Sequence, residues 1–336
     1  MSVTLARPGP VGGIVILRRY RQSAPPMAMM SSNRVLLTAT AGSPFSLDET
    51  AAYHVWRQHK LEHRPELAEL LVPVADPFAL TTAEQSRVRD LCRRSNLCIY
   101  KVTGNAQAAD KELVHQLGLQ FGLSHLDDNL RSDEDDITSL TVTEQQGNQY
   151  IPYTNRPLSW HTDGYYNAPA QQVRGFILHC AQPAAEGGEN SLIDHELVYI
   201  RIRDRDPAYI GALMHPEAMT IPANVEQGAE IRGACSGPVF SVDAVSGSLH
   251  MRYSARKRNI EWRDDELTRE AAALITEILD IDEIAYKYRL GAGEGVICNN
   301  VLHKRSGFND SADEKRLMYR ARYYDRVADT GLSRQA

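Results

Sequence analysis

The sequence predicts a mainly β protein with flanking helices, in which a β-sandwich or jelly-roll core is covered by helices. Short segments rich in β-branched and aromatic residues, such as residues 173–180 and 317–324, alternate with helical segments along the whole chain. The runner-up is a parallel α/β fold, which needs a glycine-rich loop between a strand and a helix. The glycine-rich residues 291–295 lead into a strand instead, so the α/β fold is less favoured.

Composition limits the classes of protein to which the chain can belong. Its 336 residues are enough for one large domain or two ordinary ones. The net charge of -6 argues against general affinity for nucleic acid or anionic membranes, because both require a basic surface. The cysteines are odd in number and lack metal-type spacing, which indicates a reducing compartment. No segment has the length and apolarity of a membrane span, so we expect a cytoplasmic protein.

Residues 1–45 are predicted to be a poorly ordered extension, and residues 46–330 a single domain. The extension carries Pro8, Pro10, Pro25 and Pro26 without clear periodicity. It contains arginines but no acidic residue before Asp48, a composition that fits an organellar transit peptide. A disordered tail or an upstream start codon explains the same composition, and we favour these two interpretations.

Helix and strand signals divide the rest of the chain. Ser46 with Glu49 and Thr81 with Glu84 form capping-box patterns, which predict helices over residues 48–63 and 81–94. Further helices are expected at residues 108–120, 194–203, 207–214 and 265–279. Strands are expected at residues 97–102, 173–180, 239–242, 249–253, 284–290, 295–302 and 317–324. The strand at residues 295–302 is expected to deliver His303 at its end.

Three groups of residues with metal-binding character have simpler explanations. His54, His59 and His63 are spaced so that at most one pair shares a helix face, which favours a solvated helix. The acidic run at residues 133–136 lacks the glycine and distal glutamate of an EF-hand, which favours a solvated loop. His195 has an acid on either side, and adjacent residues point apart on a helix, so we interpret it as part of a capped helix start.

The stretch SWHTDG at residues 159–164 places an imidazole and a carboxylate two residues apart. On an extended strand such residues point to the same face, so His161 and Asp163 can bind one metal ion. His303, far downstream, is the natural third ligand. Two histidines and one carboxylate form the facial triad of non-heme Fe(II) oxygenases, which leaves three coordination positions open. Alone, the histidine–aspartate pair is a weak signal and is found more often at a surface strand end.

Arginines recur on the last predicted strand. Arg316, Met318, Arg320 and Arg322 share one face of an extended chain. Periodicity alone favours a solvated basic face. The alternative is a protein interior in which an arginine binds a carboxylate through two parallel, charge-assisted hydrogen bonds.

Together these motifs resemble the Fe(II)/2-oxoglutarate dioxygenases similar to taurine dioxygenase, the TauD/TfdA family. The resemblance extends from about residue 96 to about residue 326 and includes WHTDG at 160–164, EGGENS at 186–191, NNVLH at 299–303 and RLMYRA at 316–321. It implies a double-stranded β-helix, a jelly roll similar to that of clavaminate synthase. It also implies a small-molecule partner, and neither nucleic acid nor a membrane, with homo-oligomerisation left open.

The resemblance implies a role for each site residue. The catalytic metal ligands would be His161, Asp163 and His303. Arg316 would bind the distal carboxylate of 2-oxoglutarate, and Arg320 would help to bind 2-oxoglutarate or an anionic substrate. The family usually has a threonine after the Gly-Gly-acid turn, where this chain has Asn190 followed by Ser191. Either residue would supply the hydrogen bond of that threonine to 2-oxoglutarate.

The implied function is oxidative. Fe(II), 2-oxoglutarate and O2 would be the cofactors, and 2-oxoglutarate would yield succinate and CO2. We expect hydroxylation, or cleavage triggered by hydroxylation, of a small anionic organic substrate. Asp163 supports this expectation, because related halogenases lack the carboxylate. The alternatives are a catalytically silent jelly-roll binding protein and, less favoured, a zinc hydrolase, for which the sequence has no HExxH helix.

Overall fold

The computed structural model of the chain describes residues 42–104, 111–127, 137–142, 151–226, 229–256 and 260–332. Residues Leu36–Ala336 form one compact unit. The predicted extension at residues 1–45 and the acidic run at residues 133–136 lie largely or wholly outside the described residues, so both stay predictions. None of the helices in the described part is long and apolar enough to cross a membrane.

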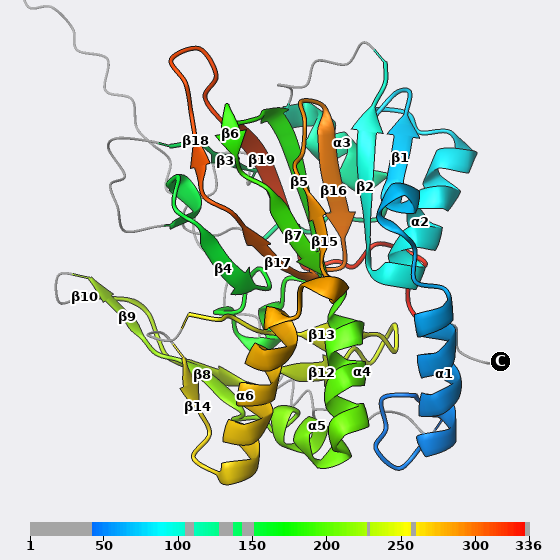
Figure 1. Ribbon diagram of the computed structural model, residues 1–336, viewed down its shortest axis with the longest axis vertical. Helices are drawn as coiled ribbons and strands as arrows, with labels where there is room; N and C mark the ends of the chain where they lie inside the picture. The colour runs from blue at the N-terminus through cyan, green and yellow to red at the C-terminus, as the bar shows by residue number, and fades with distance from the viewer. Residues whose placement is uncertain are drawn as a thin grey trace, which may run out of the picture. The chain divides into compact units, whose positions relative to one another are not determined.

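Two sheets form the centre of the unit (Figure 1). The larger sheet has the strand order β1 (Leu71–Val74), β2 (Leu97–Val102), β16 (Glu294–Cys298), β5 (Gly175–Gln182), β19 (Leu317–Tyr323) and β3 (Thr138–Leu140). The smaller sheet has the order β15 (Tyr286–Tyr288), β7 (Asn190–Ile193), β17 (Leu302–Arg305) and β4 (Leu158–His161). Apart from the parallel pair β1–β2, the described strands of these sheets pair antiparallel. The predicted class, mainly sheet with helices, is confirmed at this level.

The helices occupy two regions of the unit (Figure 1). α2 (Thr82–Ser95) and α3 (Lys111–Leu119) pack on the six-stranded sheet. α4 (His195–Arg205), α5 (Pro207–Leu213) and α6 (Glu266–Asp280) pack on one another beyond the four-stranded sheet. α1 (Thr50–Glu62) lies against α4 through its side chains.

Short strands that the sequence did not predict lie beside the second group of helices (Figure 1). They are β8 (Met219–Ile221), β9 (Asn224–Glu226), β10 (Ala229–Arg232), β11 (Cys235–Gly237) and β14 (Glu261–Trp262). The predicted pair β12 (Phe240–Val242) and β13 (Leu249–Met251) forms a hairpin near them, and β6 (Glu186–Gly187) pairs with β18 (Phe308–Asn309). The strand predicted at residues 284–290 is shortened to β15, because Asp282–Ile284 forms a 3-10 helix.

The four-stranded sheet separates two hydrophobic cores. One core lies between the two sheets and under α2 and α3, and it includes Ile177 of β5 and Leu192 of β7. The other is built from α4, α5, α6 and the small strands, and it includes Ile193 of β7 and Leu302 of β17. Adjacent strand residues point to opposite faces, so β7 contributes Leu192 to one core and Ile193 to the other. A side chain on the Leu192 face of this sheet therefore points toward the six-stranded sheet.

Helix starts follow the predicted chemistry at α2 but not at α1. The Thr81 hydroxyl accepts a hydrogen bond from the Glu84 N–H at 3.2 Å, and the Glu84 carboxylate accepts one from the Thr81 N–H at 2.7 Å. This completes the predicted capping box. The capping box predicted at Ser46 is wrong, because α1 has Glu49 at its N-cap without a side-chain hydrogen bond. Ser46 lies in a preceding turn whose carbonyl groups accept hydrogen bonds from the buried Arg203.

The single strand predicted at residues 295–302 is a second error, since the segment forms two strands in different sheets. β16 ends at Cys298 in the larger sheet, and β17 begins at Leu302 in the smaller one. Between them Asn300 has a positive φ of 51°, a conformation that asparagine adopts more readily than most residues. At this turn the chain crosses from the larger sheet to the smaller one, which places His303 in the smaller sheet.

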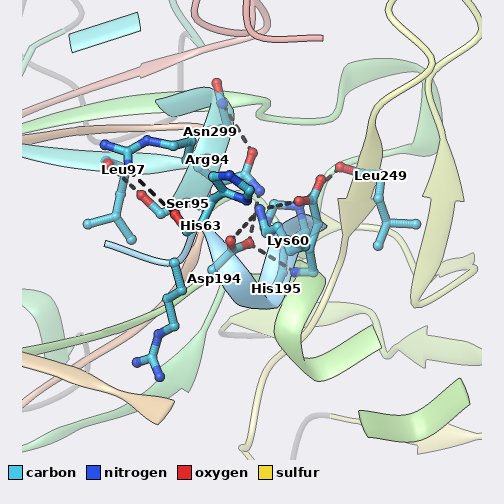
Figure 2. A network of polar contacts seen from close by, with 12 residues as sticks. Lys60, His63, Arg94, Ser95, Leu97, Asp194, His195, Leu249 and Asn299 are labelled. Carbon is cyan, nitrogen blue, oxygen red and sulfur yellow. Dashed lines mark hydrogen bonds and ion pairs between the residues drawn. The ribbon is translucent and has the colours of Figure 1, made fainter. Parts of the chain in front are cut away.

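A buried ion-pair network joins α1 to the start of α4 (Figure 2). Lys60 is 5% exposed; its Nζ lies 2.6 Å from Asp194 Oδ2 and also pairs with the Glu196 carboxylate. Asp194 accepts a hydrogen bond from the Glu196 N–H at 3.0 Å, which confirms the predicted capped helix start. His195 Nε2 lies 3.0 Å from the Leu249 carbonyl oxygen. The network fixes α4, which directly follows β7, against α1.

Candidate active site

The two predicted histidine ligands face each other across neighbouring antiparallel strands. His161 is the last residue of β4, His303 lies in β17, and the two form a direct cross-strand pair. Asp163 follows in the turn after β4. The candidate ligand atoms of the three side chains all lie within 4.8 Å of one another. The structure thus brings together the three residues that the sequence singled out.

Asn300 and Gly164 shape the turn that carries Asp163. The Asn300 side chain accepts a hydrogen bond from the Asp163 N–H at 2.8 Å and donates one to the Asp163 carbonyl at 2.9 Å. It also donates to the Val173 carbonyl at 2.6 Å. Gly164 has a φ of +66°, and a Cβ there would lie 2.5 Å from the Val173 side chain. The residue that bends the chain between β16 and β17 therefore also holds the Asp163 turn in place.

Backbone carbonyl groups orient both imidazoles. His161 Nδ1 lies 2.9 Å from the Ser159 carbonyl oxygen, and His303 Nδ1 lies 3.0 Å from the Val301 carbonyl oxygen. Because a carbonyl oxygen can only accept, each Nδ1 carries the proton and each Nε2 keeps a free lone pair. Burial, and next the neighbouring His303, lowers the pKa of His161 to about 3, and burial also lowers the pKa of His303. Both rings are neutral near pH 7, as metal binding requires.

The Asp163 carboxylate has one oxygen held and one free. Arg320 Nη1 donates to Asp163 Oδ1 at 3.0 Å, whereas Oδ2 is buried and has no hydrogen-bond partner in the described part of the chain. Burial by itself would raise the pKa of this carboxyl, but the charges of Arg320 and its neighbours hold the pKa well below its usual range. Asp163 is therefore an anion with one oxygen available. Two imidazole nitrogens and one carboxylate oxygen are a donor set suited to Fe(II).

The predicted co-substrate arginine, Arg316, lines a small cavity. This cavity is lined by Cys180, Pro183, Ala184, Gly187, Gly188, Asn190, Arg289, Leu290, Arg316 and Met318. Arg316 is 4% exposed, and within the described residues its guanidinium makes no hydrogen bond. Burial lowers the pKa of Arg316 to about 10, which still leaves it protonated near neutral pH. The cavity therefore offers a buried cation that no carboxylate of the described residues pairs with.

Asn190 and Ser191, which the sequence could not separate, point in opposite directions. Asn190 lines the cavity and lies opposite Arg305 in the β7–β17 pair. Ser191 lies opposite Lys304, on the face of β7 that points away from the cavity. The Asn190 Nδ2 is buried and has no hydrogen-bond partner among the described residues. Of the two, Asn190 is the residue that can donate to an anion beside Arg316.

The arginines of β19 lie in the protein interior, not on the solvated face that periodicity alone favours. Arg322 is 3% exposed, pairs with Asp127 and donates to the Tyr166 hydroxyl at 2.7 Å. Arg320 pairs with Asp163, so its guanidinium lies beside the candidate metal ligands. The interior position is the correct alternative for this strand, because residues on both faces of β19 are largely buried and α3 packs against it.

The remaining candidate residues behave as the simpler explanations predict. His54, His59 and His63 are exposed on α1. His195 belongs to the network of Figure 2. The sequence analysis did not assign a role to Asn300 or Arg305. For Asn300 the only signal was the Asn299-Asn300 pair shortly before His303. For Arg305 the signal was its two-residue spacing from His303, which places both side chains on the same face of a strand.

The chain is similar to known dioxygenases. A uridine-5'-phosphate dioxygenase from Amycolatopsis sp is 26% identical over 170 residues, which are 49% of this chain and 60% of that enzyme, less than two thirds of its length. A second, from Streptomyces sp, is 26% identical over 203 residues, 57% of this chain and 71% of that enzyme. The structure of the non-heme iron oxygenase OrfP with Fe and alpha-ketoglutaric acid has a TM-score of 0.54 at 14% identity, covering 73% of this chain and 80% of that one. This last match shows a likeness of fold.

The family comparison covers most of the chain. The model described as taurine catabolism dioxygenase TauD, TfdA family matches residues 41–322. This range contains both sheets and the His161, Asp163 and His303 cluster. The chain belongs to the TauD/TfdA family of non-heme iron dioxygenases, whose cofactors are Fe(II), 2-oxoglutarate and O2, as the sequence motifs predicted.

Proposed function

We propose that the protein uses Fe(II), 2-oxoglutarate and O2 to hydroxylate, or to cleave after hydroxylation, a small anionic organic substrate, with release of succinate and CO2. The observation that carries the proposal is the convergence of the His161 and His303 imidazoles with the Asp163 carboxylate, whose candidate ligand atoms lie within 4.8 Å of one another. We also propose that the two central sheets are the halves of a double-stranded β-helix. The contact between Phe176 of β5 and His303 of β17, with ring centroids 4.8 Å apart, supports this arrangement.

Each predicted residue has a role in this proposal. His161, Asp163 and His303 hold the iron, which supplies the redox chemistry with O2. Arg316 binds the distal carboxylate of 2-oxoglutarate, and Asn190 donates its unpaired Nδ2–H to the same carboxylate. Arg320 orients Asp163 through Oδ1 and adds positive charge beside the metal ligands. The neutral imidazoles and these hydrogen-bond donors are already in position for binding in the protein without cofactors.

The proposed substrate carries an anionic group. Arg320 supports this idea, because its guanidinium lies beside the metal ligands with the side chain only 11% exposed, and it can attract an anion from the substrate or the C1 carboxylate of 2-oxoglutarate. The names of the two relatives add a concrete class, since uridine 5'-phosphate is a phosphate ester. Phosphate esters are therefore the first compounds to examine, before small carboxylates and sulfonates.

A succinate-release assay tests the proposal against the alternative of a silent binding protein. Purified protein with Fe(II), 2-oxoglutarate and ascorbate is offered nucleoside 5'-monophosphates, small carboxylates, sulfonates and amines. We expect succinate release that one anionic class stimulates. Absence of both succinate release and iron binding would support the silent alternative. Release stimulated only by neutral or cationic compounds would refute the anionic substrate but not the dioxygenase.

Truncating Arg316 should weaken 2-oxoglutarate binding. Arg316→Ala is expected to reduce the binding free energy by roughly 2–5 kcal/mol, the range for removing one partner of a buried charge pair. Arg316→Lys should restore only part of it, because an ammonium cannot reproduce the planar fork of the guanidinium. The measurement is anaerobic titration of the Fe(II) protein with 2-oxoglutarate. An affinity within about twofold of wild type, far below that range, would show that Arg316 does not bind the co-substrate.

Replacing Arg320 tests the position of the substrate anion. Arg320→Gln is expected to raise the Michaelis constant for the stimulating substrate much more than the constant for the co-substrate, because it removes the charge beside the metal ligands. Glutamine keeps a hydrogen-bond donor at this position and removes only the charge and the outer part of the guanidinium. Both Michaelis constants come from the succinate assay. A larger rise in the constant for the co-substrate would assign Arg320 to 2-oxoglutarate binding.

A further inference from the structure

A second buried guanidinium lies beside Arg316. Arg305 of β17 is 6% exposed, and Arg316 is 4% exposed. Their guanidinium carbons lie over the same aromatic ring, that of Phe308, at 4.8 Å and 5.1 Å from its centroid. Arg305 shares the inward face of β17 with His303, two residues before it, and lies opposite Asn190 of β7. Arg316 and Asn190 line the cavity, and Arg305 lies next to both, through the Phe308 ring and the β7–β17 pair.

Neither guanidinium has a carboxylate partner in the described part of the chain. The Arg305 Nη atoms donate to the carbonyl groups of Pro152, Thr154 and Arg156, and its Nε is buried without a hydrogen-bond partner. The nearby Asp310 carboxylate accepts a hydrogen bond from the Arg316 backbone N–H. Burial, and then the charge of Arg316, lowers the pKa of Arg305 to about 9. Two like charges in a low dielectric repel each other, so the pair is stabilised when an anion binds between or beside them.

Resting on the proposed function, we propose that Arg305 is a positioning residue for the co-substrate. The Arg305 guanidinium packs on the Phe308 ring, which in turn packs on Arg316. Arg305 also adds a second positive charge near the end of the cavity that would hold the distal carboxylate. The pocket therefore selects 2-oxo acids that carry a second carboxylate. The simpler explanation is that Arg305 only clamps residues 152–156 against β17. The two explanations differ because a clamp depends on the shape of the side chain, whereas the selectivity depends on its charge.

The test compares two co-substrates of equal chain length. Anaerobic Fe(II) protein is titrated with 2-oxoglutarate and with 2-oxopentanoate, which lacks the distal carboxylate, by following the visible band of the iron chelate. Arg305→Gln is expected to weaken 2-oxoglutarate binding roughly tenfold, the order that one buried charge produces at a second-neighbour distance. The affinity for 2-oxopentanoate should stay within about twofold, since that acid has no charge at this end. Arg305→Lys keeps the charge and should retain most of the preference for 2-oxoglutarate.

Arg203→Gln is the matched control. Arg203 is also buried at 4% exposure and also donates to loop carbonyl groups, those of Pro44, Ser46 and Leu47, but it lies in the second core region. The Arg203→Gln substitution should lower the unfolding midpoint without changing the ratio of the affinities for 2-oxoglutarate and 2-oxopentanoate. If Arg305→Gln weakens both acids equally, or if Arg305→Lys loses the preference, Arg305 is only a clamp.

Two further outcomes remain decisive. If Arg305→Gln does not fold, Arg305→Lys tests the inference alone, because retained preference supports the role of charge and lost preference overturns it. If wild-type protein gives no chelate band with either acid although iron binds, the co-substrate assignment fails, and this inference fails with it. A normal band with 2-oxoglutarate and an unchanged preference in Arg305→Gln overturns the inference and leaves the proposed function intact.

Discussion

His161→Ala and His303→Ala are each expected to abolish the visible charge-transfer band of anaerobic protein with Fe(II) and 2-oxoglutarate. The three candidate ligand atoms lie within 4.8 Å of one another, and no fourth His, Cys, Asp or Glu joins this group among the described residues. Losing one of three protein ligands leaves too few donors to hold the ion. Even indirect partners of metal ligands change affinity by about 10- to 100-fold, so the loss of a ligand should exceed that range.

The control for this prediction is another histidine of the same chain. His59→Ala removes an exposed imidazole of α1 and should leave the band unchanged. Titration of the three variants with Fe(II) and 2-oxoglutarate, together with their unfolding midpoints, separates loss of the ligand from loss of the fold. A normal band in both His161→Ala and His303→Ala would rule out the assigned metal ligands.

The local part of the site could be predicted from the sequence because it depends on short spacings. A two-residue step on a strand is enough to place His161 and Asp163 together. The sequence indicated His303 as the third ligand because an arginine-rich strand follows it, although no spacing rule relates it to His161. The structure adds the reason that they meet, a direct cross-strand pair between β4 and β17. Register between distant strands depends on the whole sheet, and no local pattern encodes it.

The errors come from residues whose role depends on tertiary contacts. The apolar run before His303 indicated one strand, but Asn300 turns the chain into the second sheet and bonds to the Asp163 backbone. Three buried arginines, Arg203, Arg252 and Arg305, donate to backbone carbonyl groups of distant loops. A carbonyl partner leaves no signal in the sequence, because every residue has one. This is why Arg305 looked no different from a surface arginine.

The second large effect is expected on stability, from the buried network of Figure 2. Lys60→Met should lower the free energy of unfolding by about 3–5 kcal/mol, because it leaves Asp194 and Glu196 buried without their cation. Burial lowers the pKa of Lys60, but these two carboxylates outweigh burial and raise it overall. Chemical denaturation at neutral pH measures the change.

The free energy of unfolding should depend on pH differently in the wild-type protein and in Lys60→Met. Burial tends to raise the pKa of Asp194, but the Lys60 charge and hydrogen bonds lower it overall. A carboxyl with a lowered folded-state pKa stabilises the fold above its unfolded-state pKa of about 3.9. That contribution is lost as the pH falls through the lower, folded-state value. Wild type should therefore lose stability more steeply than Lys60→Met on acidification below about pH 4.

Arg57→Met is the matched control for Lys60→Met. Arg57 also lies on α1 and also pairs with an acid of α4, Asp204, but the two side chains are 36% and 33% exposed. Solvent screens an exposed pair, so its loss should cost about 0–1 kcal/mol. Both substitutions remove one cation from the contact between α1 and α4. The difference between their effects on the free energy of unfolding therefore measures the contribution of burial. Equal losses for the two variants would mean that α1 is held by its apolar packing, and that the Lys60 network does not stabilise the fold.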